Sequence, residues 1–214
     1  MAAALYNPLE KLNLAKSIEG EILSRPVSPL GELLSFFGAG VYAIYCAGAF
    51  PAYAPLKLAN AKSWAKPIYV GKAIQKGGRK GGLGLDNVGV STAIYSRLRK
   101  HADSIVATQN LSISDFVYRS IELDDIWIPL GENILIETFK PLWNLVVEGF
   151  GINDPGKGRQ DQKRSAWDIL HPGREYASRL RGGSHGSDAI LGRVDDYFHD
   201  RALRPLPKSV SKSE

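Results

Sequence analysis

Apolar residues follow two different spacings in the first half of the chain. Residues 8 to 25 place them three and four positions apart, which predicts an amphipathic helix. A second short helix is expected from Ser28, with Pro29 in its first turn, to Gly38. Residues 40 to 46 (GVYAIYC) and 67 to 71 (PIYVG) are rich in β-branched and aromatic residues, and they predict two antiparallel strands.

The second half returns to helical spacing, in alternation with one further strand. A helix is predicted over 92 to 107, a strand over 115 to 123, a helix from Pro129 to about Pro141 and an amphipathic helix near residues 190 to 198. The segments 48–66 and 73–90 read as long connections. The central β-β-α-β-α order predicts the α+β fold class, with a small antiparallel sheet flanked by helices and with helical extensions at both ends. We expect three regions: residues 1–38, 39–145 and 146–214.

Composition narrows the class of protein. Hydrophobic residues make up 44% and charged residues 23% of 214, as in a globular domain. No membrane span or secretory signal is evident, so we expect a cytoplasmic protein. Cys46 is the single cysteine, which excludes an internal disulfide and argues against a cysteine zinc site. The net charge of +5 matters less than two basic stretches, 72–101 and 157–181, which suit a polyanion such as nucleic acid but also suit ordinary solvated surface.

Two of the predicted helices carry polar residues in unusual places. Arg97 and His101 lie four positions apart, at the margin of the apolar stripe of their helix. They are candidates for a partly dry cleft, although an arginine that reaches solvent and a packed histidine are the ordinary interpretation. On the helix after Pro129, helical arithmetic turns Glu132 inward and Glu137 outward. An inward carboxylate needs a cation, a proton or a metal, and Mg²⁺ suits an oxygen ligand.

The strands each offer one tyrosine. Tyr42 and Tyr69 share one face if the two strands pair, since side chains alternate along a strand. The segments Gly40-Val41-Tyr42 and Ile68-Tyr69-Val70-Gly71-Lys72 resemble the paired signature of the GIY-YIG nucleases. The resemblance extends downstream to further residues in the same order: Arg97, His101 four residues later, the inward Glu132, Pro141 and Asn144. It covers about 105 residues, and it identifies residues 39–145 as a GIY-YIG catalytic module with the two connections inserted.

The resemblance implies both a reaction and a cofactor. Glu132 is expected to hold one Mg²⁺, for which Mn²⁺ can substitute. Tyr42, assisted by His101, is expected to take the proton of the attacking water. Arg97 is expected to stabilise charge on the phosphate, and Tyr69 is expected to orient the water or the phosphate. Asn144 is expected to connect parts of the site by hydrogen bonds. Lys72 either contacts the DNA backbone or is a plain surface lysine.

The insertions resemble those of the small Type II restriction endonucleases, in the branch that shares the SacII target CCGCGG. That resemblance implies a short palindromic GC-rich site, a homodimer on double-stranded DNA, a partner DNA methyltransferase and a prokaryotic host. Base recognition is expected from residues 73–90 and 150–181, because phosphate contacts carry no base information. The candidate DNA-binding residues are Lys72, Lys76, Arg79, Lys80, Arg159, Lys163, Arg164 and Arg174.

Two alternatives stay open at this point. A repair or homing nuclease of the same superfamily would use the same chemistry, although such enzymes usually attach separate DNA-binding domains. A non-catalytic nucleic-acid-binding protein could keep the fold, but the presence of both Tyr42 and Glu132 argues against it.

Overall fold

The computed structural model describes residues 10–75, 91–152, 154, 163–183 and 185–205. Four strands form one antiparallel sheet: β1 (Ser28–Pro29), β2 (Gly40–Cys46), β3 (Tyr69–Ala73) and β4 (Phe116–Glu122). The helices of eight or more residues are α1 (Lys11–Ser24), α3 (Ala93–Val106), α4 (Ile128–Phe139) and α8 (Ser187–Phe198). The shorter helices are α2 (Ala54–Asn60), α5 (Leu142–Leu145), α6 (Ala166–Leu170) and α7 (Glu175–Ser178), and one-turn 3-10 segments lie at Leu30–Glu32, Pro51–Tyr53 and Ile113–Asp115.

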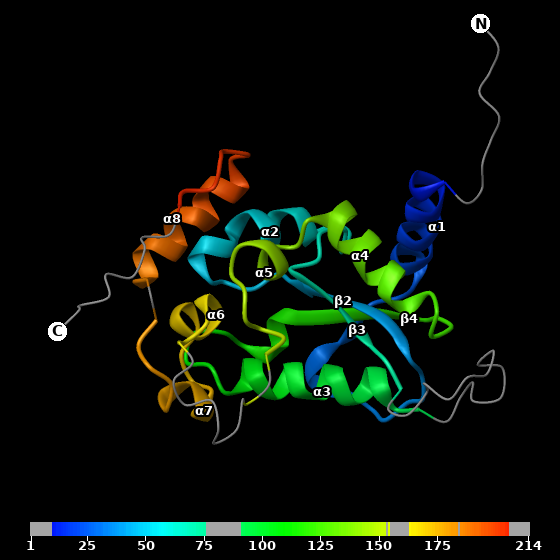
Figure 1. Cartoon of the computed structure of the whole chain (residues 1–214), viewed down its shortest axis with the longest axis horizontal. Helices are drawn as coiled ribbons and strands as arrows, with labels where there is room; N and C mark the ends of the chain where they lie inside the picture. Colours follow the sequence, from blue (N-terminus) through cyan, green and yellow to red (C-terminus); the bar gives the residue numbers. More distant parts are fainter. Residues whose placement is uncertain (1–9, 76–90, 153, 155–162, 184, 206–214) are drawn as a thin grey trace, which may run out of the picture.

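The strand order is β1-β4-β2-β3, so β2 is central and β3 is an edge strand among the described residues. The predicted antiparallel pairing is confirmed, and the strands and helices of the predicted β-β-α-β-α module occur in the expected order, with α2 as an additional helix between β2 and β3. Strand β2 is buried along its whole length because helices cover both faces of the sheet (Figure 1). Its side chains therefore divide between two cores.

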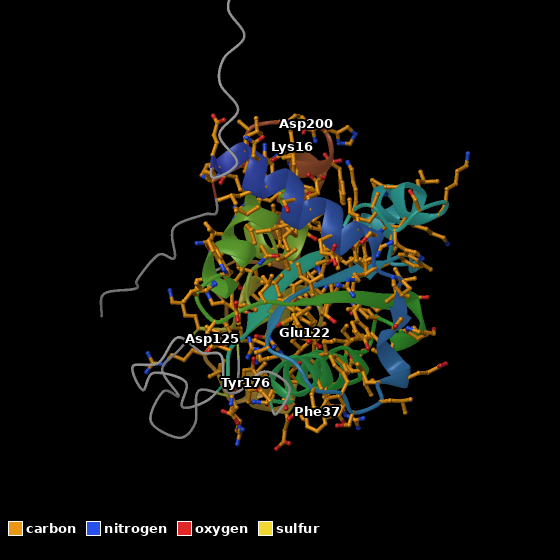
Figure 2. All side chains as sticks on the ribbon, turned by 90° about the vertical axis from the view of Figure 1, so that its right-hand side faces the viewer. Lys16, Phe37, Glu122, Asp125, Tyr176 and Asp200 are labelled. Atoms are coloured by element: carbon orange, nitrogen blue, oxygen red, sulfur yellow. The ribbon has the colours of Figure 1, made fainter. Side chains whose placement is uncertain are left out.

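On one face, Val41, Ala43 and Tyr45 pack with residues of α1 and α4. Figure 2 shows α1 in blue lying across the strands, with exposed Lys16 on its outer side. On the other face, Tyr42 and Ile44 belong to a larger cluster with residues of α2, α3, α5, α6 and α8. The larger cluster thus joins the sheet to residues of the 146–214 segment.

The predicted helix over 28–38 is wrong. Ser28 and Pro29 instead pair with Tyr118 and Val117 of β4, which extends the sheet by one short strand. The segment then makes a single 3-10 turn and runs extended, leaving Leu34 83% exposed. Pairing with the open edge of β4 satisfies backbone groups that a short helix with proline near its start would leave free.

The segment 48–66 is more than a connection, because it contains α2. Pro55 in the first turn starts this helix, and Leu56 is buried against the larger cluster. Asn60 holds its end: Nδ2 donates to the carbonyls of Cys46 and Lys66, and Oδ1 accepts from the Lys66 amide. Within the described residues, no helix is long and apolar enough to span a bilayer.

Candidate active site

Tyr42 and His101 form a buried hydrogen-bonded pair. The Tyr42 hydroxyl lies 2.8 Å from His101 Nε2. Tyr42 comes from the central strand β2 and is 0% exposed, while His101 comes from α3 and is 3% exposed. His101 was expected at the margin of its helix stripe, but it lies fully within it. The tyrosine and histidine singled out from distant segments therefore meet inside the protein.

Tyr69 stands beside this pair on the edge strand β3. Its ring centroid lies 6.4 Å from that of Tyr42 and 5.1 Å from that of His101. The register pairs Tyr42 with Gly71 and Ile44 with Tyr69, so both phenols face the same side of the sheet, as predicted. A Cβ at position 71 would lie 2.5 Å from the Tyr42 hydroxyl, so glycine leaves the space that the phenol occupies.

Charges around the pair set its protonation. Burial raises the pKa of Tyr42 far above its ordinary value, Tyr69 and Glu132 raise it further, and Arg97 lowers it. Burial also lowers the pKa of His101 from 6.5 to about 3, with further lowering by Arg97, Arg174 and Lys100. In the free protein near neutral pH, Tyr42 is therefore a phenol and His101 a neutral imidazole.

Glu132 lies on α4 with its side chain 17% exposed and ion-paired to Lys72 of β3, with 2.6 Å between Oε2 and Nζ. Lys72 thus contacts a carboxylate rather than standing alone on the surface. Glu137, one and a half turns later, is 64% exposed and pairs with Lys11 of α1. The inward and outward orientations expected for the two glutamates are both observed.

Asn144 fastens α5 to the edge strand. Its Oδ1 accepts from the Val70 amide and its Nδ2 donates to the Val70 carbonyl, both at 2.9 Å. The Trp143 amide donates to the Ile68 carbonyl at 2.9 Å. These bonds satisfy the amide and carbonyl groups of Val70 and the carbonyl of Ile68, with which a further strand could otherwise pair, and they hold β3 beside β2.

The donor set fits one divalent cation held mainly by oxygen ligands. Glu132 is the carboxylate near the two phenols, and its negative charge raises the pKa of both. The described residues contain no group of three or more His, Cys, Asp or Glu that could hold a metal. A site with a single carboxylate suits Mg²⁺, which keeps several waters and shares substrate phosphate oxygens.

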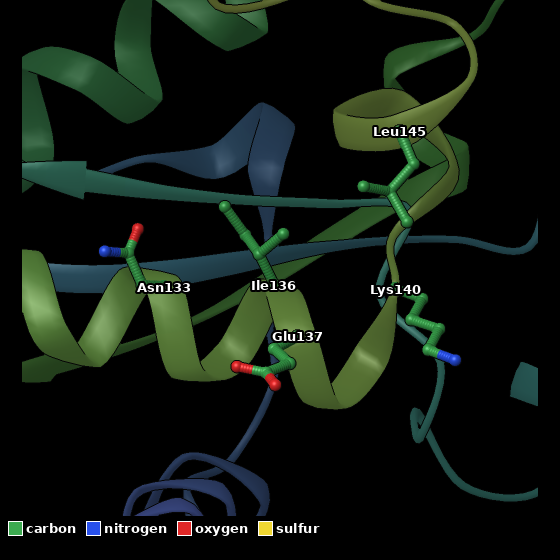
Figure 3. Close-up of a pocket in the computed structure, with 5 residues that line it drawn as sticks. All are labelled: Asn133, Ile136, Glu137, Lys140 and Leu145. Atoms are coloured by element: carbon green, nitrogen blue, oxygen red, sulfur yellow. The ribbon is translucent and has the colours of Figure 1, made fainter. Parts of the chain in front are cut away.

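One hollow among the described residues lies away from this cluster. A pocket of about 310 Å³ is lined by Asn133, Ile136, Glu137, Lys140 and Leu145, on the outer side of α4 (Figure 3). None of the residues of the tyrosine-histidine cluster lines it.

The structure describes half of the eight predicted DNA-binding residues, including Lys72, which pairs with Glu132. Lys76, Arg79, Lys80 and Arg159 lie outside the described residues. Lys163 and Arg164 are exposed, and Arg164 donates from Nε to the Ala177 carbonyl. Arg174 requires a correction: it was expected to reach guanine edges, but its side chain is 4% exposed and pairs with buried Asp168.

Sequence reasoning missed Phe150, which is 1% exposed and stacks on His101 with 4.5 Å between ring centroids and 21° between planes. It also missed Gly151, where a Cβ would lie 2.5 Å from the Tyr69 hydroxyl. Residues 145–152 have no periodic pattern that could have pointed to either one. A lone phenylalanine flanked by glycines was the available signal.

The family model described as the Eco29kI GIY-YIG domain matches residues 34–198. The match covers more than half of the chain, including every strand from β2 onward and all of the clustered residues. No curated protein gives a significant match. With the paired tyrosines on adjacent strands and the arginine, histidine and glutamate around them, the chain belongs to the GIY-YIG nucleases of the Eco29kI type.

Proposed function

We propose that the protein is a Type II restriction endonuclease that hydrolyses phosphodiesters of double-stranded DNA with Mg²⁺. The observation that carries the proposal is the buried Tyr42–His101 hydrogen bond of 2.8 Å, with Arg97 and Glu132 close enough to shift the pKa of the phenol. A buried tyrosine needs a hydrogen-bond partner in any case, but the cation and the carboxylate near Tyr42 go beyond what packing requires. The family match supports the same class of enzyme.

In the proposed reaction, a water molecule attacks phosphorus while the bond to the leaving oxygen breaks with its electron pair. Tyr42 takes the proton of the water at its oxygen and passes its own proton to Nε2 of His101. The imidazole is a weak base in the free protein, because burial and the nearby cations disfavour its charged form. A bound phosphate brings negative charge, which favours the imidazolium and strengthens His101 as an acceptor.

The remaining residues have supporting roles in this proposal. Arg97 balances charge that accumulates on the phosphate oxygens. Tyr69 orients the water or the phosphate, and Asn144 keeps the edge strand in place. Glu132 would hold a Mg²⁺, or Mn²⁺ in its place, which when bound polarises the phosphate. Lys72 positions the Glu132 carboxylate in the structure and is also within reach of an approaching DNA backbone.

Recognition of a short palindrome, with CCGCGG as the proposed site, would require two copies of the chain related by a two-fold axis. A methyltransferase of the same specificity would then protect the host. Lys163 and Arg164 are the described exposed candidates for DNA contact. Arginine and lysine bind the guanine edge in the major groove, which agrees with a GC-rich target.

The two glutamates of α4 provide a matched test. Plasmid DNA is digested with Mg²⁺ or with EDTA, using the parent protein, Glu132→Gln and Glu137→Gln. We expect discrete fragments from the parent with Mg²⁺ only, no cutting by Glu132→Gln, and near-parental cutting by Glu137→Gln, whose side chain is 64% exposed. DNA binding should survive in both variants.

Three outcomes would reject parts of the proposal. Efficient cutting by Glu132→Gln would remove this carboxylate from the reaction. Cleavage only at damaged positions would favour a repair nuclease over a restriction enzyme. DNA binding without cleavage under any divalent cation would favour a non-catalytic binding protein.

A further inference from the structure

We propose that Arg174 is a positioning residue for the reaction: paired with Asp168, it holds the turn of residues 149–152 so that Phe150 covers His101. The inference rests on the proposed function, since it assigns a role within the same site. Of the two predicted DNA-binding arginines that the structure describes, Arg164 is exposed and Arg174 is buried.

Arg174 uses its guanidinium as a multiple donor inside the protein. Nε donates to Asp168 Oδ1 at 2.7 Å. One terminal nitrogen donates to the carbonyls of Phe150 and Ile152 at 3.2 Å each, and the other donates to Gly149 at 3.0 Å. Three carbonyls of a four-residue turn are thus held by one rigid planar group, which a lysine cannot reproduce.

Neighbouring side chains hold the guanidinium itself in place. Its carbon lies over the rings of Trp167 and Tyr176, at 4.4 and 5.0 Å from the ring centroids. The second oxygen of Asp168 accepts from the Ser165 hydroxyl at 2.6 Å. The Arg174 and Asp168 side chains are 4% and 2% exposed, so this is a buried and fully engaged ion pair. Such a pair fixes geometry rather than offering a free cation to solvent.

The turn that Arg174 holds forms one wall of the active site. Phe150 stacks on His101 and meets the Tyr69 ring edge-on, with 5.0 Å between centroids. Gly151 follows directly, and its backbone approaches the Tyr69 hydroxyl so closely that a Cβ would lie 2.5 Å away. A shift of this turn would therefore uncover the imidazole and displace a phenol in one movement.

The surroundings of Arg174 do not favour a phosphate contact. A small hollow of about 290 Å³ borders it on the outside. Besides Arg174, its charged lining consists of three carboxylates, Asp103, Asp154 and Glu175, and one further cation, Arg179. Carboxylates repel a polyanion. Arg174 also lowers the pKa of His101, after burial and Arg97.

The test compares Arg174→Lys with Arg25→Lys. Arg25 follows α1, outside both expected DNA-reading segments; its side chain is 54% exposed and pairs with Glu21 at the surface. Single-turnover cleavage is measured at saturating DNA, and DNA affinity is measured in EDTA. We expect Arg174→Lys to cleave about 100-fold more slowly with unchanged affinity, since a misplacement of roughly 1 Å costs that much in rate. Arg25→Lys should match the parent.

A second measurement does not depend on cleavage. Deuterium exchange at the histidine C2 position, followed by mass spectrometry, reports the access of water to each ring. We expect Arg174→Lys to accelerate exchange at His101, while His199, whose side chain is 60% exposed, exchanges equally in both proteins. If Arg174→Lys does not fold, Phe150→Leu carries the same two measurements, with the same direction expected for each.

The outcomes separate the inference from the function on which it rests. Weaker DNA binding by Arg174→Lys with an unchanged saturated rate would make Arg174 a DNA contact and overturn the inference. Parental rate and parental exchange in a folded variant would overturn it as well. Failure of both the parent and Arg25→Lys to cleave DNA would instead reject the proposed function, and the exchange at His101 would still report on the turn.

Discussion

Two tyrosine–histidine hydrogen bonds of similar geometry allow catalysis to be separated from folding. Tyr42 bonds to His101 at 2.8 Å, and Tyr53 bonds to His171 at 2.6 Å. All four side chains are buried. The first pair lies beside Arg97, whereas burial alone accounts for the lowered pKa of His171. We predict that Tyr42→Phe and Tyr53→Phe both destabilise the protein but that only Tyr42→Phe abolishes cleavage.

The expected loss of stability follows from the bonds that each hydroxyl makes. Removing either one leaves a buried imidazole nitrogen without its partner, at a cost of about 1–3 kcal/mol. Tyr53 also accepts a hydrogen bond from the indole N–H of Trp143 at 2.9 Å. Tyr53→Phe therefore leaves a second buried group without its partner and should lose more stability than Tyr42→Phe. In a domain of this size each kcal/mol lowers the melting temperature by about 2–4 °C.

The assay pairs thermal unfolding with single-turnover cleavage, measured where all three proteins are folded. Loss of a general base lowers rates by about 100- to 10,000-fold, and we expect Tyr42→Phe to fall in that range. Tyr53→Phe should cleave within a small factor of the parent despite its lower melting temperature. Equal losses of cleavage in the two variants would show that the burial of a tyrosine–histidine pair, rather than proton transfer at Tyr42, supports activity.

Two further predictions use groups around the same core. Because burial lowers the pKa of His101 and of His171 from 6.5 to about 3, the unfolded chain binds more protons between those values. The contribution of the two neutral imidazoles to the free energy of unfolding should therefore be complete above about pH 6.5 and should be lost as the pH falls toward 3. An unfolding midpoint that is unchanged between about pH 7.5 and 4.5 would contradict the burial of both rings. Gly151→Ala should slow cleavage without weakening DNA binding, since the added Cβ would lie 2.5 Å from the Tyr69 hydroxyl. Gly186→Ala serves as the control, because a Cβ there would have nothing within 4 Å. Equal cleavage rates for the two variants would show that the Tyr69 phenol can move at no cost.

The central module could be predicted because its signals are local. Alternation in residues 40–46 placed Tyr42 opposite to Val41, and helical spacing placed Glu132 inward and Glu137 outward. Both orientations depend on geometry that acts within a few residues. The pairing of β2 with β3 followed from composition and order, and the structure agrees.

The features that sequence reasoning missed depend on contacts between distant segments. Ser28 and Pro29 form a strand because β4 offers a free edge about 90 positions later, and no local pattern reports that edge. Arg174 looks like a surface cation in sequence, because a basic stretch does not reveal that Asp168 and three carbonyls will enclose one of its members. Burial of a charge depends on tertiary partners rather than on residue type.

The position of β3 at the edge of the sheet links the fold to the reaction. Tyr42 lies on the neighbouring central strand, where both faces are covered by helices, and a rigid phenol there can be held against His101. Tyr69 lies on the edge strand itself. Helix α4 packs against the same strand, which brings Glu132 of α4 to Lys72 of β3. Asn144 completes the edge by bonding to the backbone of β3, which leaves no free backbone ladder at that point for another chain to pair with. Asn144 thus blocks strand addition at Val70, and in the proposed reaction the phosphodiester would reach Tyr69 and Glu132 at this edge of the sheet.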